Sequence, residues 1–498
     1  MTRHAPARRP IALLLGAALA AVGCSALASP GPSQGPSSLR AVASYDSGVV
    51  QVDGVRVLRA LPGLGMASVE GTPASLARLA RARGVRGVAP DDAVQLTGGS
   101  SAGTAVPAAQ GLGGQAGTQR AGRGVRVAVV DTGVTDSAAL DRRSGRLVDA
   151  FDADGGRPPY DDGFGHGTFM ASVVAGGPAP GSDGKAVGVA PAATVLVVRV
   201  ARPDGTTSMS KVLAGLDWVV RNAGSVDVAN LSFSHQRPGA AYGADPLTDA
   251  VDRVRAAGVT VVVSAGNEPG LVGDPGFTPR ALTVGAASLT GPPQVAEWSG
   301  SGLVAGVAKP DLVANGVSVL GILPPGSLVA RSNPQARVGG ALWRGTGSSQ
   351  ATAVTSGVVA LLLQRRPDAT PAEVKAVLRA SARPLPGARD GAGLLRIAHG
   401  KAYGAGESAL DGRGPDPTGE GSFDASSWSA SSWSASSWSA SSWSASSWSA
   451  SSWSASSWSA SSWSASSWSA SSWSASSWSA SSWSASSWSA SSWSGRAP

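Results

Sequence analysis

The sequence predicts an α/β protein with a doubly wound, mostly parallel sheet, preceded by a small α+β domain and followed by a repetitive tail. Between residues 123 and 402, short valine-rich runs with little polar alternation are separated by helical segments. Strands that helices cover on both faces of a parallel sheet have this composition. The runs are Val125–Val130, Thr194–Val200, Val226–Leu231, Val259–Val263 and Leu282–Val284.

Residues 1–28 are predicted to be an export signal. Arg3, Arg8 and Arg9 precede the apolar run Ile11–Val22, and Ala26-Leu27-Ala28 offers the small residues of a cleavage site. The apolar run is too short to cross a bilayer as a helix. Arg, Ala and Gly are abundant, as in proteins from GC-rich genomes, so we expect a bacterial protein that is secreted or associated with the cell envelope.

Cys24 is the only cysteine of the 498 residues, so the chain can form no internal disulfide. The sequence Ala21-Val22-Gly23-Cys24 resembles a lipoprotein processing box, in which lipid is attached to the thiol. The competing interpretation is that Cys24 is removed together with the signal after Ala28. In both cases stability has to come from packing or from bound ions.

Residues 40–97 are predicted to form the small α+β domain. Apolar residues alternate in segments such as Val55–Leu58, while Pro73–Ala82 places Leu76 and Leu79 on one helical face. Residues 98–122 are rich in Gly, Ala and Ser, and we expect them to form a flexible linker that a peptidase can reach.

Helix signals follow in the larger domain. Asp245-Pro246 opens a segment that ends at Gly258, and Thr370-Pro371-Ala372-Glu373 is a capping box with proline at the first helical position. His166 and Ser349 each begin a segment of small residues, which predicts two buried helices.

Three short motifs supply the parts of a nucleophilic site. Asp131-Thr132-Gly133 offers an orienting carboxylate, His166-Gly167-Thr168 a general base and Gly347–Ala351 a serine. Asp131 follows a predicted strand, and functional groups gather at the carboxyl ends of parallel strands. A serine at a helix N-terminus lies near N–H groups that stabilise an oxyanion. Each motif alone is weak, but their order predicts a serine peptidase with Asp131, His166 and Ser349 as catalytic residues.

The segment from Arg123 to about Gly400 resembles the subtilisin-like serine peptidases. The resemblance rests on Val-Val-Asp-Thr-Gly around Asp131, Gly-His-Gly-Thr around His166 and Ser-Ala-Gly-Asn, which ends at Asn267. It selects Ser349 over Ser348, because Ala351 and Gly357 fit the register of the family's helix only from Ser349. Gln350 stands where many relatives carry methionine.

The resemblance implies further roles. Asn267 would donate to the oxyanion, and the substrates would be polypeptides. Gly84–Asp91 resembles the last strand of subtilisin propeptides, so residues 40–97 would be the chain's own transient inhibitor in a self-processing zymogen. An independent N-terminal module is the alternative. The implied substrate-binding residues are Ser232, Phe233, Ser234, Ser264, Ala265 and Gly266.

We expect no cofactor in the chemistry, and the metal ligands stay open. Structural calcium is a common accessory of the family, and the acidic stretch Asp152–Asp162 offers carboxylates, although solvated loop charges explain that stretch equally well. The net charge is +8, but the basic residues are scattered without aromatic interleaving, so we expect no nucleic acid partner.

Residues 403–424 are expected to be a linker, and residues 425–498 repeat the unit Ala-Ser-Ser-Trp-Ser. A step of five residues places successive Trp side chains on no common face of a helix or strand, so we expect a disordered tail. The alternative is a tether, in which the indoles bind envelope glycans or one another.

A second class of function remains as an alternative to the endopeptidase. The chain would then be a surface-binding or envelope-tethered protein whose protease fold is a vestigial scaffold. The presence of all four residues, Asp131, His166, Asn267 and Ser349, favours the enzyme.

Overall fold

The computed structural model describes residues 38–96, 104–113, 115–234, 245–304, 307–387 and 389–397. The predicted export signal with Cys24, the linker 403–424 and the repeat tail lie outside the described residues. Those predictions therefore stay predictions. Within the described residues, no helix has the length and hydropathy that crossing a membrane would require.

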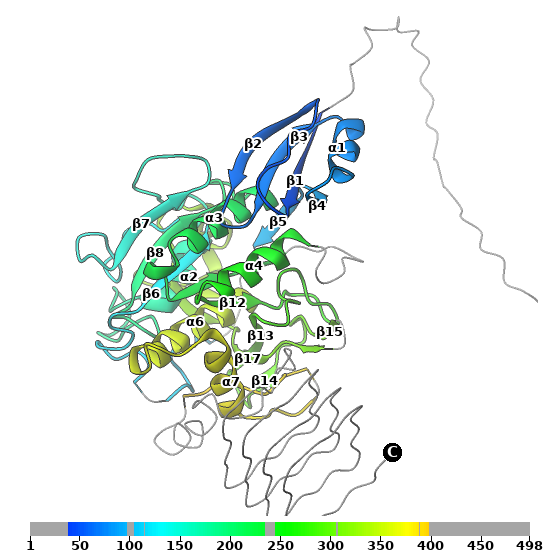
Figure 1. Ribbon diagram of the computed structural model, residues 1–498. Helices are drawn as coiled ribbons and strands as arrows, with labels where there is room; N and C mark the ends of the chain where they lie inside the picture. Colours follow the sequence, from blue (N-terminus) through cyan, green and yellow to red (C-terminus); the bar gives the residue numbers. More distant parts are fainter. Residues whose placement is uncertain are drawn as a thin grey trace, which may run out of the picture. The chain divides into compact units, whose positions relative to one another are not determined.

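The central sheet has eight strands and is parallel except for one edge strand, which confirms the predicted fold class (Figure 1). Its order is β14-β13-β12-β10-β6-β8-β7, and β17 pairs with β13. The strands are β6 (Arg126–Asp131), β7 (Leu147–Asp152), β8 (Thr194–Arg199), β10 (Val228–Leu231), β12 (Thr260–Ser264), β13 (Leu282–Ser288), β14 (Gln294–Val295) and β17 (Leu312–Asn315).

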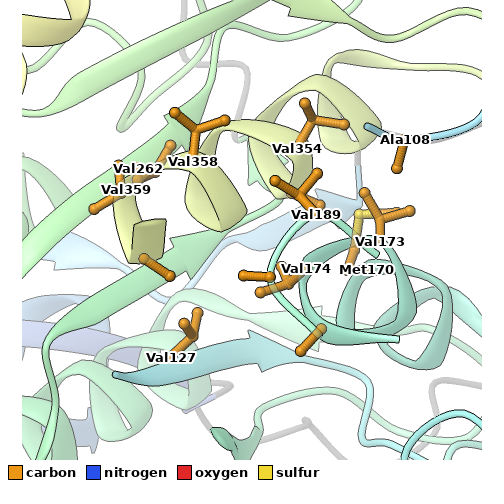
Figure 2. Close-up of a cluster of buried hydrophobic side chains, with 14 of the residues drawn as sticks. Ala108, Val127, Met170, Val173, Val174, Val189, Val262, Val354, Val358 and Val359 are labelled. Carbon is orange, nitrogen blue, oxygen red and sulfur yellow. The ribbon is translucent and has the colours of Figure 1, made fainter. Parts of the chain in front are cut away.

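Helices cover both faces of this sheet. Val127 and Val129 of β6 pack with one set of helices, whereas Ala128 and Val130 pack with the other, because successive side chains of a strand point to opposite faces. Figure 2 shows the first core, where Val127 lies with side chains of the first set. The first set is α2 (His166–Ala175), α6 (Ser348–Arg365) and α7 (Pro371–Ser381), and the second is α3 (Met209–Arg221) and α4 (Pro246–Ala256).

The predicted caps are present. Asp245 accepts a hydrogen bond from the backbone N–H of Leu247 at the start of α4. At the start of α7, Thr370 and Glu373 form the reciprocal capping box. The two segments of small residues are the buried helices α2 and α6.

The small domain is an antiparallel sheet of order β2-β3-β1-β4 with one helix, α1 (Pro73–Ala80). Its own core is built around Ala43, Val69, Leu76 and Leu79. The strands are β1 (Leu39–Tyr45), β2 (Val55–Leu61), β3 (Met66–Gly71) and β4 (Val85–Pro90).

The expected linker, residues 98–122, differs in the structure from the expectation. Its described part packs on the large domain: Ala108 and Ala121 are buried, and the N–H of Ile397 donates to the carbonyl of Leu112. Val106 forms a bridge with Val319. Small residues allow this close packing against the large domain. In the described part of residues 104–122, their abundance therefore reflects close packing and not flexibility.

The sequence analysis did not predict several short elements. Three of them form a small separate sheet of order β11-β5-β9: β5 (Ala93–Leu96), β9 (Thr207–Ser208) and β11 (Phe233–Ser234). The unpredicted elements also include β7, β14 and β17 of the central sheet, together with β15 (Gly302–Val304), β16 (Val307–Lys309), β18 (Val319–Ile322), β19 (Arg337–Gly339), β20 (Leu342–Gly345), α5 (Leu328–Ser332) and the 3-10 turns Ala223–Ser225 and Pro334–Ala336.

Candidate active site

Asp131 and His166 meet at the carboxyl edge of the sheet. Asp131 is the last residue of β6 and His166 the first of α2. The Nδ1 atom of His166 lies 2.8 Å and 3.0 Å from the two carboxylate oxygens of Asp131. Gly167 permits this approach, because a Cβ atom there would lie 2.2 Å from the carbonyl oxygen of Gly133. The carboxylate thus fixes the imidazole with Nε2 on the opposite side of the ring.

Thr132 and Asp162 form a buried network under this pair. The hydroxyl of Thr132 donates to Asp162 at 2.8 Å and accepts the N–H of Gly167 at 2.9 Å. Asp162 also accepts the N–H groups of Gly165 and Thr168, together with the Thr168 hydroxyl. Since Gly165, the N-cap of α2, has no side chain, Asp162 and Thr132 satisfy the first turn of the helix that carries His166.

The charges of the two carboxylates act on His166. Burial lowers the pKa of His166, but the charge and hydrogen bond of Asp131 and the charge of Asp162 raise it, and the net pKa lies above its ordinary value. Burial raises the pKa of Asp162, against the hydrogen bonds that favour its ionised form. Four donors to one carboxyl group suit the carboxylate rather than the acid.

Ser349 lies in the first turn of α6, and its side chain is buried. Its Oγ donates to the carbonyl of Ser232 at 3.0 Å. The Nε2 atom of His166 is buried and has no hydrogen-bond partner among the described residues. Ser348 is buried as well, and its Oγ likewise has no partner within the described part of the chain.

Asn267 reaches the start of α6 from the loop after β12. Its Oδ1 accepts the backbone N–H of Ser348 at 2.9 Å. This hydrogen bond fixes the amide group and leaves its NH₂ donors directed away from that bond. A side-chain donor therefore stands beside the N-terminus of α6, where a developing negative charge would be stabilised.

The predicted substrate-binding residues line two neighbouring strand ends. Ser232, Phe233 and Ser234 are buried at β11, and the Oγ of Ser264 donates to the carbonyl of Phe233 at 2.9 Å. The backbone of Ala265 continues the β12 pairing by donating to Val284. Gly266 has φ +93° and accepts the N–H of Gly300.

An internal strand, β5, occupies the space between β9 and β11. Leu96 pairs with Phe233 and Gln95 with Ser234, while Val94 pairs with Thr207 on the other side. Leu96 and His166 both line a pocket of about 300 Å³, so β5 ends beside the candidate base. The small domain thus extends a strand from its last residues into the predicted substrate-binding region.

The acidic stretch Asp152–Asp162 does not gather around a common point. Arg199 binds Asp152 through both oxygens, Lys211 pairs with Asp154, and Asp162 takes part in the network under His166. Among the residues that the structure describes, no three His, Cys, Asp or Glu side chains are placed to hold one metal ion.

The profile of the subtilase family, Peptidase_S8, matches residues 122–412, which is more than half of the chain. The chain belongs to the subtilase family. This subtilase is 33% identical over 280 residues to the serine protease AprX of Bacillus subtilis (strain 168). It is 31% identical over 267 residues to subtilisin E of the same strain. Each match covers 52% of this chain and 61% of the relative.

The solved structure of fervidolysin from Fervidobacterium pennivorans, described as a keratinolytic enzyme related to subtilisin, has the same fold. It matches with a TM-score of 0.57 at 24% identity and covers 77% of this subtilase and 62% of that chain. This likeness supports the architecture.

Sequence reasoning missed Thr132 and Asp162 as partners of His166, and it missed β5. Asp162 lies four residues before His166, and its place before a glycine N-cap was the available signal for a helix cap. In β5, the exposed residues Ala93 and Gln95 alternate with the more buried Val94 and Leu96, and this two-residue period was visible in the sequence.

Proposed function

We propose that this subtilase is a serine endopeptidase that hydrolyses polypeptides through Asp131, His166 and Ser349. The observation that carries the proposal is the bond between Asp131 and Nδ1 of His166, which leaves Nε2 as the basic atom. His166 would take the proton of Ser349 as its Oγ attacks a carbonyl carbon, and would then return that proton to the leaving amine. The side chains supply this chemistry without a cofactor.

The tetrahedral oxyanion would be stabilised at the start of α6. Asn267 is anchored through its Oδ1, so its NH₂ group is oriented before substrate arrives. A donor fixed in advance stabilises charge without reorganising during the reaction.

Substrate would bind as an added antiparallel strand. β5 supports this mode, because it already pairs with β11 on one side and β9 on the other through main-chain bonds. Main-chain pairing accepts many sequences, and side-chain pockets then select among them.

The chain's own small domain is the first substrate in this proposal. The register pairs Gln95 with Ser234 and Leu96 with Phe233. Leu96, the last residue of β5, therefore lies opposite Phe233, which directly follows Ser232, and the carbonyl of Ser232 accepts the Ser349 hydroxyl. We therefore propose self-cleavage between Thr97 and Gly98, after which residues 40–97 remain bound as a transient inhibitor.

Contacts beside α3 and α4 would keep the cleaved domain bound. Asp91 accepts both the N–H and the hydroxyl of Ser210, and Asp217 accepts the N–H of Gly63. Four apolar residues of the domain share a buried core with α3 and α4 of the subtilase domain: Val42, Leu61, Leu64 and Met66. Such an interface keeps the product strand in the cleft.

Intact mass tests the proposal. We would express the chain without residues 1–28, as wild type and as Ser349→Ala, and measure the mass of each purified product. The wild type should be cut after Thr97 and the variant should stay whole. Cleavage after Leu96 would revise the register, whereas identical fragments in both proteins, or none in either, would refute catalysis by Ser349.

Export and anchoring complete the proposal. Residues 1–28 would direct export, and lipid at Cys24 would hold the protein at the envelope if the thiol is processed. The tail, residues 425–498, would be either a disordered extension or a tether to glycans or to other copies. Palmitate labelling of wild type and Cys24→Ala distinguishes an anchored protein from a secreted one.

A further inference from the structure

A second pocket lies next to the candidate active site, and the proposed chemistry does not use it. Its volume is about 600 Å³. Thr168 of α2 is part of its wall, and Leu323 lines both this pocket and the pocket beside His166. A cavity of this size holds a side chain as large as an indole. We call it the proline pocket, after three prolines in its lining: Pro180, Pro324 and Pro325.

The lining of the proline pocket suits an aromatic ring. Trp343 of β20 is half-buried and lines the pocket together with the three prolines. Two arginines line it as well. Arg331 donates to the carbonyl of Gly326, and Arg337 donates to the carbonyl of Gly340 at 3.1 Å. These main-chain bonds hold both guanidinium groups at the pocket, where a cation can lie over the face of a bound ring. The pocket therefore favours an aromatic side chain whose neighbours carry no positive charge.

The chain itself carries such side chains in its repeat tail. Residues 425–494 contain only Ala, Ser and Trp, and their fourteen indoles recur every five residues from Trp428 to Trp493. This segment has no charge that the two arginines would repel, and the Ala and Ser residues beside each Trp are small enough for its main chain to enter a groove. A buried indole N–H needs an acceptor, and the exposed carboxylate of Asp136 stands at the pocket. The tail therefore matches the pocket in both shape and charge.

The described chain ends within reach of the proline pocket. The last described residue, Ile397, donates its N–H to the carbonyl of Leu112. Val106, six residues before Leu112, forms a bridge with Val319, the first residue of β18. Ile322, the last residue of β18, lines the pocket. The six residues, the length of β18 and the two crossings between neighbouring segments together span at most about 40 Å.

The connection between Ile397 and the first tail indole, Trp428, covers this distance. Thirty residues lie between the two. A chain of that length reaches about 100 Å when extended, and as the disordered chain that the sequence predicts it has a root-mean-square span of about 30 Å. A tethered group has its highest local concentration when span and distance match in this way. We infer that an indole of residues 425–494 docks in the proline pocket of its own chain, which holds the tail beside the candidate active site.

Photo-crosslinking from the wall of the pocket tests this inference. Ala138 lines the pocket and is exposed, so Ala138→Cys can carry a small alkyl diazirine. The full chain would also contain Cys24→Ala, which leaves a single thiol, and Ser349→Ala, which prevents self-cleavage. After irradiation and digestion with trypsin, mass spectrometry should find the tail peptide joined to the peptide that contains residue 138. Because the contact lies within one chain, the yield should not change with protein concentration.

Matched variants locate the contact. Trp343→Ala removes a stacking partner, so the yield of the cross-link should fall about tenfold. Trp298→Ala, at a half-buried tryptophan that does not line the pocket, should leave the yield unchanged. A full-length variant with alanine in place of all fourteen tail tryptophans should lose the cross-link. That variant leaves every described residue of the domain unchanged, so it decides the question if Trp343→Ala fails to fold.

The position of the label provides the last control. The same diazirine at Ala256→Cys, on an exposed residue of α4 that does not line the pocket, should capture little of the tail. The inference is overturned if this label captures the tail as well as the label at residue 138 does, or if the alanine tail cross-links like the parent. It is also overturned if the product is a dimer whose yield rises with protein concentration, because the pocket would then bind the tail of another copy.

Discussion

Replacing Thr132 by valine tests the network under His166 most directly, because valine keeps the shape and removes the hydroxyl. The hydroxyl donates to Asp162 at 2.8 Å and accepts the Gly167 N–H at 2.9 Å, and both partners are buried. Leaving the buried N–H of Gly167 without a partner costs about 1–3 kcal/mol, and Asp162 loses one of its four donors, a hydrogen bond worth about 0.5–1.5 kcal/mol. Allowing for partial relaxation, we expect a loss of about 2–4 kcal/mol in the free energy of unfolding.

The assay is thermal unfolding in the Ser349→Ala background, where self-cleavage is prevented. For a domain of this size the loss corresponds to a drop of about 5–15 °C in Tm. Thr132→Ser is the control, because it retains the hydroxyl and should melt close to the parent. If the valine and serine variants melt at the same temperature, Thr132 does not satisfy the first turn of α2 in the way we describe.

Three further predictions concern the site and the small domain. Asn267→Ala should lower kcat about 10²- to 10³-fold with little change in KM, as measured by steady-state kinetics on a peptide substrate. A change in KM as large as the change in kcat would contradict an oxyanion role. Because the pKa of His166 is raised and only its neutral form accepts a proton, kcat/KM should decrease as the pH is lowered, beginning above about 6.5. Asp162→Asn should shift this decrease to lower pH, and an unchanged pH profile would show that the charge of Asp162 does not raise the pKa of His166. Asp91→Ala removes the two bonds to Ser210, equivalent to the loss of a helix cap of about 0.5–2 kcal/mol, so active enzyme should appear about 2- to 30-fold faster after self-cleavage, and an unchanged lag would count against this contact.

The sequence predicted the parts of the fold that depend on periodicity. The valine runs became β6, β8, β10, β12 and β13, because strands that are apolar on both faces need helices on both sides. The sequence also placed Asp131 at the end of a strand and His166 at the start of a helix, because short linear motifs mark both positions.

Contacts between distant segments could not be read in the same way. Strand β5 pairs with residues more than a hundred positions away, so the two-residue period of its side chains could not indicate that its partners are β9 and β11. No linear motif indicates that Lys309 and Lys375 both reach the buried carboxylate of Asp311. The Gly-, Ala- and Ser-rich sequence around residues 108 and 121 suggested a flexible linker, because closely packed segments and flexible linkers are both rich in small residues.

Under the proposed self-cleavage, strand β5 would make the timing of activation depend on protein concentration. Before cleavage, the segment is tied to its own cleft, and a tethered group of this kind has an effective concentration of about millimolar. Cutting the chain after residue 97 removes the tether but not the interface around Leu61, Leu64 and Met66. In the proposed self-cleavage, the newly cut enzyme would therefore stay blocked until its former N-terminal domain dissociates, and a dilute solution of it should become active sooner than a concentrated one.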